Sequence, residues 1–387
     1  MHLVAQEYIS NPCLLANSAK FDLRVYVLLT SISPLRLYVY EEGLVRFASN
    51  RYSTRLEDIT NQFIHLTNYS VNKNCVEYVA SSGADSQDGH KWTLKSLWRY
   101  MAAAGIGDPA RLWAAIIDLV VKTVISAESQ ILALLKTQLK NRRSCFELLG
   151  FDIMLDEALK LWLLEVNITP SLRADSPLDY SVKNQLVKDI LNTIGYQLSP
   201  RFRKHYNFGA ALSPEKADYL NEMKVANEEK VSAMHLCFES VWEFLSILTP
   251  FVPFFQHRKY ETQYLEGGFT ACQDMIEALN EDDLYQLMES EDELQRAGQF
   301  RRVFPVRETA RAYLPFFDFP YYYNLLLINW EERYGGGGDR GEGIARIRAE
   351  MMKRPQVAEC YAKLKVSAWN FGVFNANSCL FSEPARE

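Results

Sequence analysis

Two pairs of strand-like segments, set apart by two long helical stretches, constrain the fold of this chain more than any other feature. The first pair is Leu23–Leu29 and Leu35–Tyr40, with the turn signal Ser33-Pro34 between them. The second pair is Cys145–Leu155 and Leu161–Val166. All four segments are rich in β-branched, aromatic and aliphatic residues and are bounded by turn residues, which is the composition of β-hairpins. The sequence therefore predicts two hairpins.

Helical spacing of apolar residues accounts for most of the remaining first 200 residues. Leu94, Leu97 and Met101 predict one helix, which ends at Gly105. Longer apolar patterns predict helices over residues 110–139 and 180–194, and the polar stretch 81–89 predicts a loop. Glu41-Glu42-Gly43 is expected to end the second strand. Residues 1–200 are therefore predicted to form an α+β domain, in which a sheet is layered with helices.

The character of the chain changes beyond residue 200. Residues 196–230 predict a connector and a helix, and residues 231–330 are helical and aromatic in pattern, so residues 201–334 are predicted to form a mainly helical C-terminal extension. Gly335 to Gly338 form a run of four glycines, which predicts a flexible linker. Residues 335–387 are accordingly expected to be a flexible tail.

Composition excludes several classes of protein. Apolar residues make up 48% of the chain, enough for a large core. Seven scattered cysteines without a Cys-x-x-Cys pair predict reduced thiols, not a disulfide framework or a zinc site. The first residues lack the pattern of a secretory signal, and the apolar stretch Phe244–Phe255 is short and broken by prolines, so no membrane partner is expected. A pI of about 5.7 argues against a nucleic-acid partner.

The net charge of −6 is unevenly distributed along the chain. Residues 1–200 carry 20 basic and 20 acidic side chains, whereas residues 201–387 carry 22 and 28. The overall field therefore does not attract an acidic partner, and local basic clusters would have to do so.

Three polar residues of the second hairpin predict a metal site. Asp152 lies on its first strand, and Glu165 and Asn167 lie two residues apart on the next, so these two side chains share one face. Three hard oxygen ligands suit Mg²⁺ with open positions for phosphate oxygens. Polar residues on the wet face of a hairpin fit the same spacing. The apolar neighbours Trp162–Leu164 count against that alternative, because polar groups are costly in an apolar strand unless they have partners.

Charges also alternate along the first predicted strand. Lys20, Asp22 and Arg24 face one way, an arrangement that suits a polyphosphate with a sugar hydroxyl nearby. A solvated strand face with a charge pair is the alternative, and the pattern alone favours it. The run His65–Ser70 is rich in small hydrogen-bonding side chains, which either line a polar pocket or form a turn. Arg46, in an apolar segment, is by itself a weak candidate for a carboxylate clamp.

Six segments occur together in a characteristic order: Gln6-Glu7-Tyr8-Ile9, Lys20–Val27, Tyr40–Ala48, His65–Lys73, Gly150–Ile153 and Trp162–Asn167. This ordered set resembles the tubulin tyrosine ligase-like family, which has an ATP-grasp fold. The resemblance is strong over residues 1–200 and extends more weakly to about residue 334, through segments such as Gly298–Pro305. Within the family the chain looks most like a polyglutamylase of the member 4 type, as Gly89-His90-Lys91-Trp92 indicates.

The resemblance implies a ligase that uses ATP and Mg²⁺ to join free L-glutamate to a glutamate of an acceptor protein through an acyl phosphate. It implies that Asp152, Glu165 and Asn167 bind the metal and that Arg24 stabilises the phosphoryl charge. It also implies eight nucleotide-binding residues: Gln6, Glu7, Tyr8, Ile9, Lys20, Asp22, Thr67 and Asn68. Where Glu7 stands the family often has a basic residue, a departure that matters little if the backbone reads the adenine.

The resemblance further implies a pocket for the incoming glutamate, formed by Arg46, Tyr69, Ser70, Lys91 and Lys183. The two lysines suit a second carboxylate, which favours glutamate over the glycine or tyrosine used elsewhere in the family. Family members that lengthen glutamate chains tend to carry His after the metal-binding asparagine, and branch initiators carry an aliphatic residue. Ile168 at that position implies branch initiation.

Tubulin C-terminal tails on microtubules are the acceptors that the family implies, with other acidic proteins left open. Cytoplasm and cytoskeleton are the expected locations, and the sequence does not distinguish cilium from centriole. The family core starts upstream of Gln6, so the expectation is an ATP-grasp core whose N-terminal part is missing, and the activity of this chain alone is left open. A catalytically inactive, shortened form that binds tubulin is the alternative. The metal triad favours the enzyme, because binding alone does not require it.

Overall fold

A computed structural model of the chain describes residues 6–15, 18–138, 146–195, 252–319 and 321–354. The chain divides into two compact units. The first contains residues 1–194 and 295–319, and the second contains residues 195–294 and 320–387. The predicted connector and helix at residues 196–230 and the following stretch to residue 251 lie outside the described residues.

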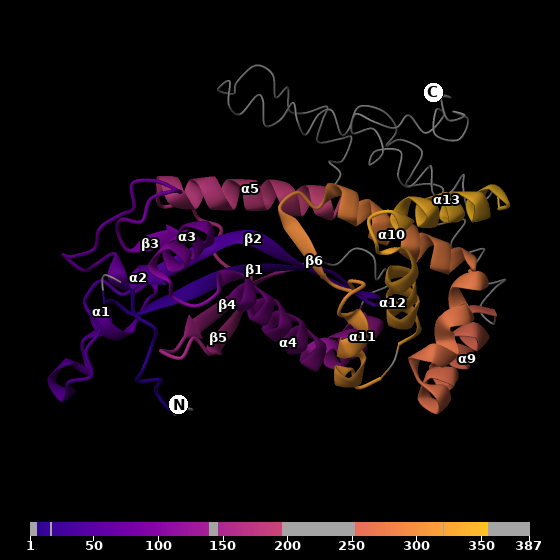
Figure 1. The fold of residues 1–387 in the computed structure, drawn as a ribbon, viewed down its shortest axis with the longest axis horizontal. Coiled ribbons are helices and arrows are strands. Elements are labelled where there is room, and N and C mark those ends of the chain that lie inside the picture. The colour runs from indigo at the N-terminus through magenta and orange to yellow at the C-terminus, as the bar shows by residue number, and fades with distance from the viewer. Residues whose placement is uncertain (1–5, 16–17, 139–145, 196–251, 320, 355–387) are drawn as a thin grey trace, which may run out of the picture. The chain divides into compact units, whose positions relative to one another are not determined.

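The first unit is built on one antiparallel sheet, in which both predicted hairpins form (Figure 1). The strand order is β3-β2-β1-β4-β5, and β6 pairs with β2. Strand β1 pairs with β4, so the sheet joins the two hairpins through their first strands. The strands are β1 (Phe21–Ile32), β2 (Leu35–Phe47), β3 (Lys91–Thr93), β4 (Glu147–Leu155), β5 (Leu161–Ile168) and β6 (Phe300–Phe304).

Strand β2 does not end at Glu41-Glu42-Gly43, and that prediction was wrong. Gly43 continues the pairing with β1, and a side chain there would collide with the backbone carbonyl of Arg24. Glu42 is buried and accepts hydrogen bonds from the backbone N–H groups of Gly43 (3.1 Å) and Lys95 (3.2 Å). These residues therefore act as strand residues, and the longer β2 brings Arg46 opposite Asp22.

The three long helices predicted for the first unit are confirmed: α3 (Leu94–Ala104), α4 (Pro109–Gln138) and α5 (Pro177–Thr193). Thr93 caps α3 by accepting a hydrogen bond from the Ser96 N–H (3.1 Å), and Gly105 ends it in the left-handed region with φ of 67°. Helix α4 packs against β1, β5 and β6, while α5 packs against β2 and β3 (Figure 1). The short elements are η1 (Leu56–Asp58), α1 (Gln62–His65), α2 (Tyr69–Asn72), α11 (Ala310–Tyr313) and η4 (Leu314–Phe316).

Residues 295–319 return to the first unit, which differs from the mainly helical extension predicted for residues 201–334. Strand β6 pairs with β2, with Phe300 opposite Tyr40 and their ring centroids 4.9 Å apart. The segment before β6 is tied to the end of α5, where the Gln299 N–H donates to Asp189 Oδ2 (3.1 Å). Burial of Phe300 and Phe304 against the sheet explains why this segment forms a strand.

The described part of the second unit is helical, as predicted. Its elements are α9 (Val252–Gly267), η3 (Phe269–Glu277), α10 (Glu281–Arg296, whose last two residues belong to the first unit), α12 (Tyr322–Tyr334) and α13 (Asp339–Met352). The fully buried Trp330 lies in the core of this unit, and its Nε1–H donates to Glu291 (2.9 Å). Glu291, which lies in the acidic run Glu289-Ser290-Glu291-Asp292-Glu293, is thus buried and hydrogen-bonded.

The glycine run is a turn between two packed helices, which corrects the prediction of a tail from residue 335. Gly343 of α13 lies against Trp330 and Tyr334 of α12, where a side chain would collide with both rings. Arg340 pairs with Glu291 (2.6 Å) and Glu331 (2.7 Å). Residues 355–387 lie outside the described residues.

Two other predictions from composition can be compared with the structure. The cysteines among the described residues, Cys13, Cys75 and Cys272, are free and buried. Within the described ranges, no helix has both the length and the apolar character that crossing a membrane requires.

Asp283 gives the second unit a pH dependence that can be measured. Its side chain is buried and accepts hydrogen bonds from the Asn280 N–H (2.9 Å) and the Tyr322 hydroxyl (3.0 Å). Burial raises the pKa of the Asp283 carboxyl to about 7. A carboxyl whose pKa is higher in the folded than in the unfolded state stabilises the fold. This contribution is fully present at pH values below the pKa of the unfolded state, and it is lost as the pH rises through the pKa of the folded state.

Wild type is therefore expected to lose stability relative to Asp283→Asn as the pH rises from 4.5 to 7. The asparagine oxygen can accept the same two hydrogen bonds but does not titrate. The difference in free energy of unfolding should change by roughly 3 kcal/mol over this range. Urea denaturation of both proteins across the range measures it, and two parallel curves would contradict a raised pKa.

Candidate active site

One face of the sheet carries a row of charged side chains, with basic residues at the β3 end and acidic residues at the β5 end. Strand pairing places Lys91 opposite Arg46 and Arg46 opposite Asp22, across β3, β2 and β1. Two residues along β1, Arg24 lies opposite Asp152 of β4, and Asp152 lies opposite Glu165 of β5. Directly paired residues project from the same side of a sheet. The row therefore extends across five strands.

Arg46 and Arg24 hold the buried carboxylates of this row. Arg46 donates from Nε to Asp22 Oδ1 (2.8 Å) and from Nη2 to both Asp22 Oδ2 (2.5 Å) and Asp152 Oδ2 (2.8 Å). Arg24 forms a bidentate pair with Asp152, with distances of 2.5 and 2.9 Å. Asp22 and Asp152 are each only 2% exposed, so the solvated strand face that the pattern alone favoured is wrong. Arg46 does clamp carboxylates, and the ones it holds here belong to the protein.

Burial and ion pairing set the ionisation of this network. Burial disfavours the charge on Asp152, but hydrogen bonds and charges from Arg24 and Arg46 hold the pKa of the Asp152 carboxyl below its usual value. Burial likewise opposes the charge on Arg46, and its pairs with Asp22 and Asp152 raise the pKa of the guanidinium nevertheless. The ion pairs therefore favour the charged forms of Asp152 and Arg46, and the strands hold both side chains in place.

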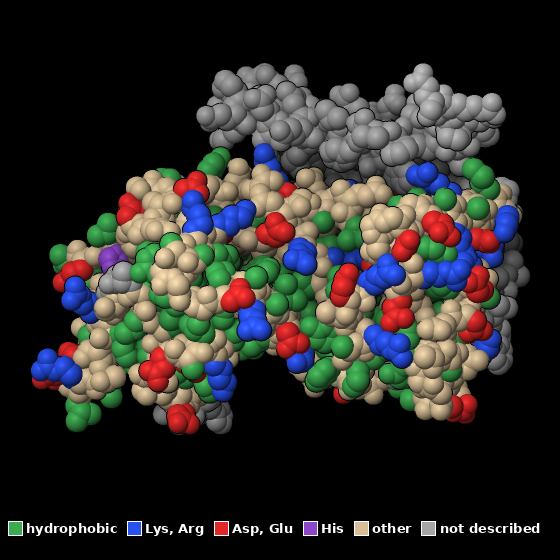
Figure 2. Space-filling model, in the orientation of Figure 1, with side chains coloured by type: hydrophobic (Ala, Val, Ile, Leu, Met, Phe, Trp, Pro, Cys, Tyr) green, Lys and Arg blue, Asp and Glu red, His purple; other side chains and the backbone are tan. Residues whose placement is uncertain are grey.

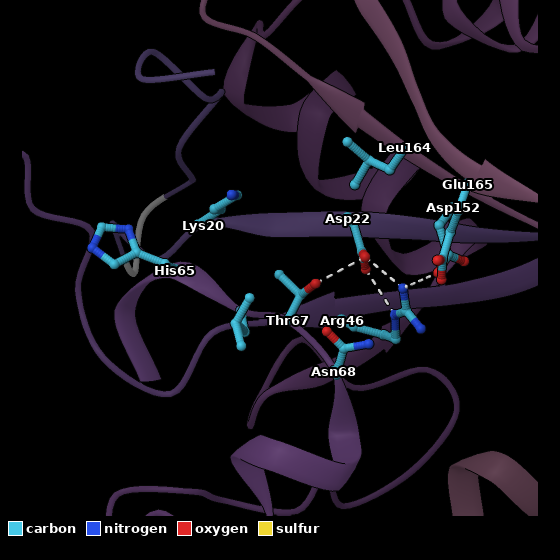
Figure 3. A pocket seen from close by; sticks show the side chains of 10 residues that line it. Lys20, Asp22, Arg46, His65, Thr67, Asn68, Asp152, Leu164 and Glu165 are labelled. Atoms are coloured by element: carbon cyan, nitrogen blue, oxygen red, sulfur yellow. Dashed lines mark hydrogen bonds and ion pairs between the residues drawn. The ribbon is translucent and has the colours of Figure 1, made fainter. Parts of the chain in front are cut away.

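An open pocket of about 190 Å³ lies over this network (Figure 3). Of the predicted site residues it brings together Lys20, Asp22, Arg46, Thr67, Asn68, Asp152 and Glu165. The Thr67 hydroxyl donates to Asp22 Oδ2 (2.8 Å), which links the loop before α2 to the sheet. The pocket is also lined by His65, Leu66 and Leu164, which were not predicted as site residues. His65 and Leu66 open the His65–Ser70 run, so the run does line a polar pocket.

The predicted adenine hinge is only partly joined to this pocket. Gln6, Glu7 and Tyr8 are exposed and Ile9 is half-buried, and none of the four is among the lining residues. Tyr8 reaches toward the pocket, because its hydroxyl lies 2.9 Å from His65 Nδ1 and accepts from Lys20 Nζ (3.3 Å). Burial lowers the pKa of the Lys20 ammonium, while the nearby Asp22 raises it.

The three predicted metal-binding side chains converge at the edge of the pocket. Asn167 Nδ2 lies 3.0 Å from Glu165 Oε1 and 3.4 Å from Asp152 Oδ2. Carboxylate and amide oxygens are the donors that Mg²⁺ takes, so the set fits that ion, although the amide would have to turn its oxygen inward. Both Asp152 oxygens are bonded to arginines, and among the described residues no cluster of three or more His, Cys, Asp or Glu could hold a metal.

The argument from an apolar strand was wrong for β5. This strand is the last in the sheet order, and Leu163 and Leu164 are 36% and 44% exposed. Glu165 is exposed as well, so its position carries no large burial cost. What supports the metal site is the convergence of the three side chains, not the hydrophobicity of the strand.

The lysines predicted to bind glutamate meet at a carboxylate that sequence reasoning missed. Lys91 Nζ lies 2.7 Å and Lys183 Nζ 3.1 Å from Asp179, near the start of α5. Lys91 Nζ also lies 4.3 Å from the centre of the Tyr69 ring. Ser70 is exposed, and so is Ile168, which is 70% exposed. Neither lysine lines the pocket, but Lys91 is the cross-strand neighbour of Arg46.

Comparison with known proteins adds the family. Residues 1–205 match the model of the tubulin-tyrosine ligase family. The chain is 42% identical over 355 residues to tubulin monoglutamylase TTLL4 of Mus musculus, covering 89% of this chain and 27% of that protein. It is 36% identical over 345 residues to tubulin polyglutamylase ttll-4 of Caenorhabditis elegans, covering 89% of this chain and 51% of that protein.

Tubulin polyglutamylase TTLL5 of Mus musculus is 34% identical over 370 residues, which cover 95% of this chain and 26% of that relative. The chain thus spans about a quarter of the length of the mouse relatives that it matches. The family match covers more than half of the chain and includes strands β1 to β5, the pocket and the charge row. The chain therefore belongs to the tubulin-tyrosine ligase family.

Proposed function

We propose that this chain is part of an ATP- and Mg²⁺-dependent ligase that joins free L-glutamate to glutamate side chains of tubulin tails. The row of charged side chains on one sheet face carries this proposal, because four of its members, Asp22, Arg46, Asp152 and Glu165, line the pocket. Its cations suit phosphate groups, and its oxygen donors suit Mg²⁺. The relatives named as tubulin glutamylases support glutamate and tubulin as the substrates.

In this proposal Lys20 holds the phosphates of ATP by charge, while Asp22, Thr67 and Asn68 orient the nucleotide. Asp152, Glu165 and Asn167 would hold Mg²⁺, which neutralises negative charge on the phosphates when bound. Backbone groups of Gln6 to Ile9 would contact the adenine. Arg24, fixed by its bidentate pair with Asp152, would face the charge that develops on the transferred phosphoryl group.

The proposed reaction has two steps. A carboxylate oxygen of the acceptor attacks the γ-phosphorus, the bond to ADP breaks, and an acyl phosphate forms on the acceptor. The amine of the free glutamate then attacks the acyl carbon, an amide forms, and phosphate leaves with the bonding electrons. Charges that the strands already hold in place suit both steps.

Arg46, Tyr69, Ser70, Lys91 and Lys183 would bind the free glutamate. Arg46 keeps Nη1 free of partners among the described residues, so it retains a donor for a carboxylate. Lys91 and Lys183 share one carboxylate, which leaves one positive charge for a second carboxylate of the substrate. This charge favours glutamate over glycine or tyrosine.

A tubulin acceptor would place the protein in the cytoplasm, at the cytoskeleton. Other acidic proteins meet the same chemical requirement. On the face drawn in Figure 2, basic and acidic side chains are interspersed. An acidic tail would therefore be attracted by local clusters rather than by the field of the whole surface.

Glutamate incorporation tests the proposal directly. The 387-residue chain, and a form extended by the codons that precede Met1, would be incubated with ATP, Mg²⁺, isotope-labelled glutamate and microtubules. We expect labelled tubulin from at least one form, none from its Asp152→Ala/Glu165→Ala variant, and one ADP per glutamate. If neither form incorporates glutamate or hydrolyses ATP, the ligase proposal is overturned, and microtubule co-sedimentation then tests the binding-only alternative.

Branch initiation is the finer proposal, and it rests on Ile168 together with the naming of the mouse relative as a monoglutamylase. Ile168 is exposed directly after Asn167, so a substitution there should change acceptor choice without disturbing the core. Ile168→His is expected to shift the products from single glutamates toward chains of two or more. Mass spectrometry of tubulin tail peptides measures the distribution, with Ile168→Val as control. Equal distributions for His and Val would contradict the proposal.

A further inference from the structure

Asp179 joins two buried lysines in a cluster beside the charge row. Its Oδ2 accepts from Lys91 Nζ (2.7 Å), and its Oδ1 lies 3.1 Å from Lys183 Nζ. Asp179 is 0% exposed, Lys91 6% and Lys183 8%. Lys91 comes from β3 and Lys183 from α5, so one carboxylate fixes two cations from separate elements.

This cluster has one more positive charge than negative charge. Its members are two ammonium groups and one carboxylate, and the neighbouring Arg173 and Asp175 pair with each other (2.7 Å). The other direct contacts of the lysines are uncharged, namely the Tyr69 ring for Lys91 and the Arg173 carbonyl (2.5 Å) for Lys183. The Asp175 carboxylate also acts on Lys183 through its charge, but its ion pair is with Arg173. Buried charges are costly unless paired, so the cluster is completed by one further anionic group.

The location of the cluster indicates which anion that is. Lys91 is the cross-strand neighbour of Arg46, which lines the pocket. An amino acid with two carboxylates can place one at Arg46 and the other at the lysines. Burial lowers the pKa of Lys183, while the Asp179 charge raises it, so Asp179 helps to keep this lysine protonated for that contact.

A role in capping α5 is the competing explanation for Asp179. Ser176 is the N-cap of this helix. Its hydroxyl accepts a hydrogen bond from the Asp179 N–H (3.1 Å) and donates one to Asp179 Oδ2 (2.9 Å). Capping, however, requires only these two hydrogen bonds between Ser176 and Asp179. It does not account for two lysines buried against the same carboxylate.

We infer that Asp179 is a positioning residue that holds Lys91 and Lys183 together and thereby sets the preference for a dicarboxylic amino acid. This inference rests on the proposed function and adds a residue to it. Asp179 does not touch the substrate in this arrangement. It acts by fixing where the excess positive charge lies.

Asp179→Asn is expected to raise the KM for glutamate by at least about tenfold, because the two unpaired lysines repel each other and separate. The KM for ATP and the kcat at saturating glutamate should stay near wild type. The preference for glutamate over glutamine, measured by competition with two isotope labels, should fall by a similar factor. The assay uses the form of the protein that incorporates glutamate.

Two further variants separate positioning from capping. Ser176→Ala weakens the cap but keeps the carboxylate, so it should lower Tm and leave the KM for glutamate unchanged. Asp179→Glu keeps the charge but shifts it by one methylene, so it should raise that KM by less than Asn does. This variant also decides the matter if Asp179→Asn does not fold.

An Asp179→Asn variant with an unchanged or lower KM for glutamate would overturn the inference, as would equal effects of Asp179→Asn and Ser176→Ala on that KM. An Asp179→Glu variant with the wild-type KM would do the same. If the unmodified protein incorporates no glutamate, the proposed function fails instead, so the two failures are distinguishable.

Discussion

Asp152→Ala is expected both to abolish glutamate incorporation and to destabilise the first unit. Its carboxylate is 2% exposed and is bonded to two arginines. Removing it leaves Arg24 without its ion pair and Arg46 with Asp22 alone, in a largely buried setting. Losing one partner of a buried pair typically costs about 3–5 kcal/mol. Incorporation should fall by about a thousandfold or more, as when a preorganised electrostatic group is removed from an active site.

Glu165→Ala is the matched control for this prediction. Glu165 belongs to the same proposed metal site, but it is exposed, and it accepts a hydrogen bond from Asn167 (3.0 Å). Its removal should cost activity as strongly while changing stability by no more than about 0.5 kcal/mol. Urea denaturation and incorporation assays on both variants separate the two effects. Full activity in Glu165→Ala would count against the metal site, and an unchanged stability of Asp152→Ala would count against the buried network.

Arg46→Lys should be nearly as damaging, although it conserves the charge. The guanidinium donates to Asp22 and Asp152 at once, through Nε and Nη2. A lysine ammonium is a compact group without this planar fork, so it can satisfy one carboxylate well but not both. Asp152 keeps its pair with Arg24, but the bidentate pair of Asp22 and one bond to Asp152 are lost, and we expect a loss of roughly 2–3 kcal/mol in unfolding free energy. Incorporation should also be lost, because Arg46 lines the pocket.

Arg24→Lys provides the comparison on the other side of Asp152. The two side chains are almost equally exposed, Arg24 at 12% and Arg46 at 11%, but Arg24 holds one carboxylate where Arg46 holds two, and Asp152 keeps its bond to Arg46 when Arg24 is shortened. The fold should therefore remain close to wild type in stability, while ATP turnover falls, since Arg24 is proposed to face the transferred phosphoryl group. Thermal melts and ADP release measure the two quantities. Equal destabilisation by both substitutions would contradict the expectation that the arginine holding two carboxylates matters more for stability than the arginine holding one.

Local composition was enough to predict the hairpins and the helices, because β-branched runs, turn residues and helical spacing are local signals. Strand periodicity was likewise enough to predict that the side chains of Glu165 and Asn167 lie on one face, since residues two apart share a strand face. Strand β6 was missed because it is five residues long and is stabilised by pairing with β2, far away in the sequence. Such pairing leaves no local pattern.

The partners of Arg46 could not be predicted for a related reason. They depend on the register between β1 and β2, which contains irregularities near Val25 and Leu29, and on the pairing of β1 with β4. Asp179 was missed because a carboxylate three residues after a serine looks like an ordinary helix start. The exposure of β5 was misjudged because composition alone does not reveal which strand is last in a sheet.

The pairing of β1 with β4 also determines when the charge row is completed as the chain folds. Arg46 and Asp22 pair within one hairpin, whereas Arg24 pairs with Asp152, which lies 128 residues further along the chain. During synthesis the three basic residues of the row, Arg24, Arg46 and Lys91, are therefore made before Asp152. Contacts of such long range are formed slowly. A ribosome-bound chain that ends before β4 would carry Arg24 without its counterion. Other anions can then bind to the Arg24 guanidinium until Asp152 is available.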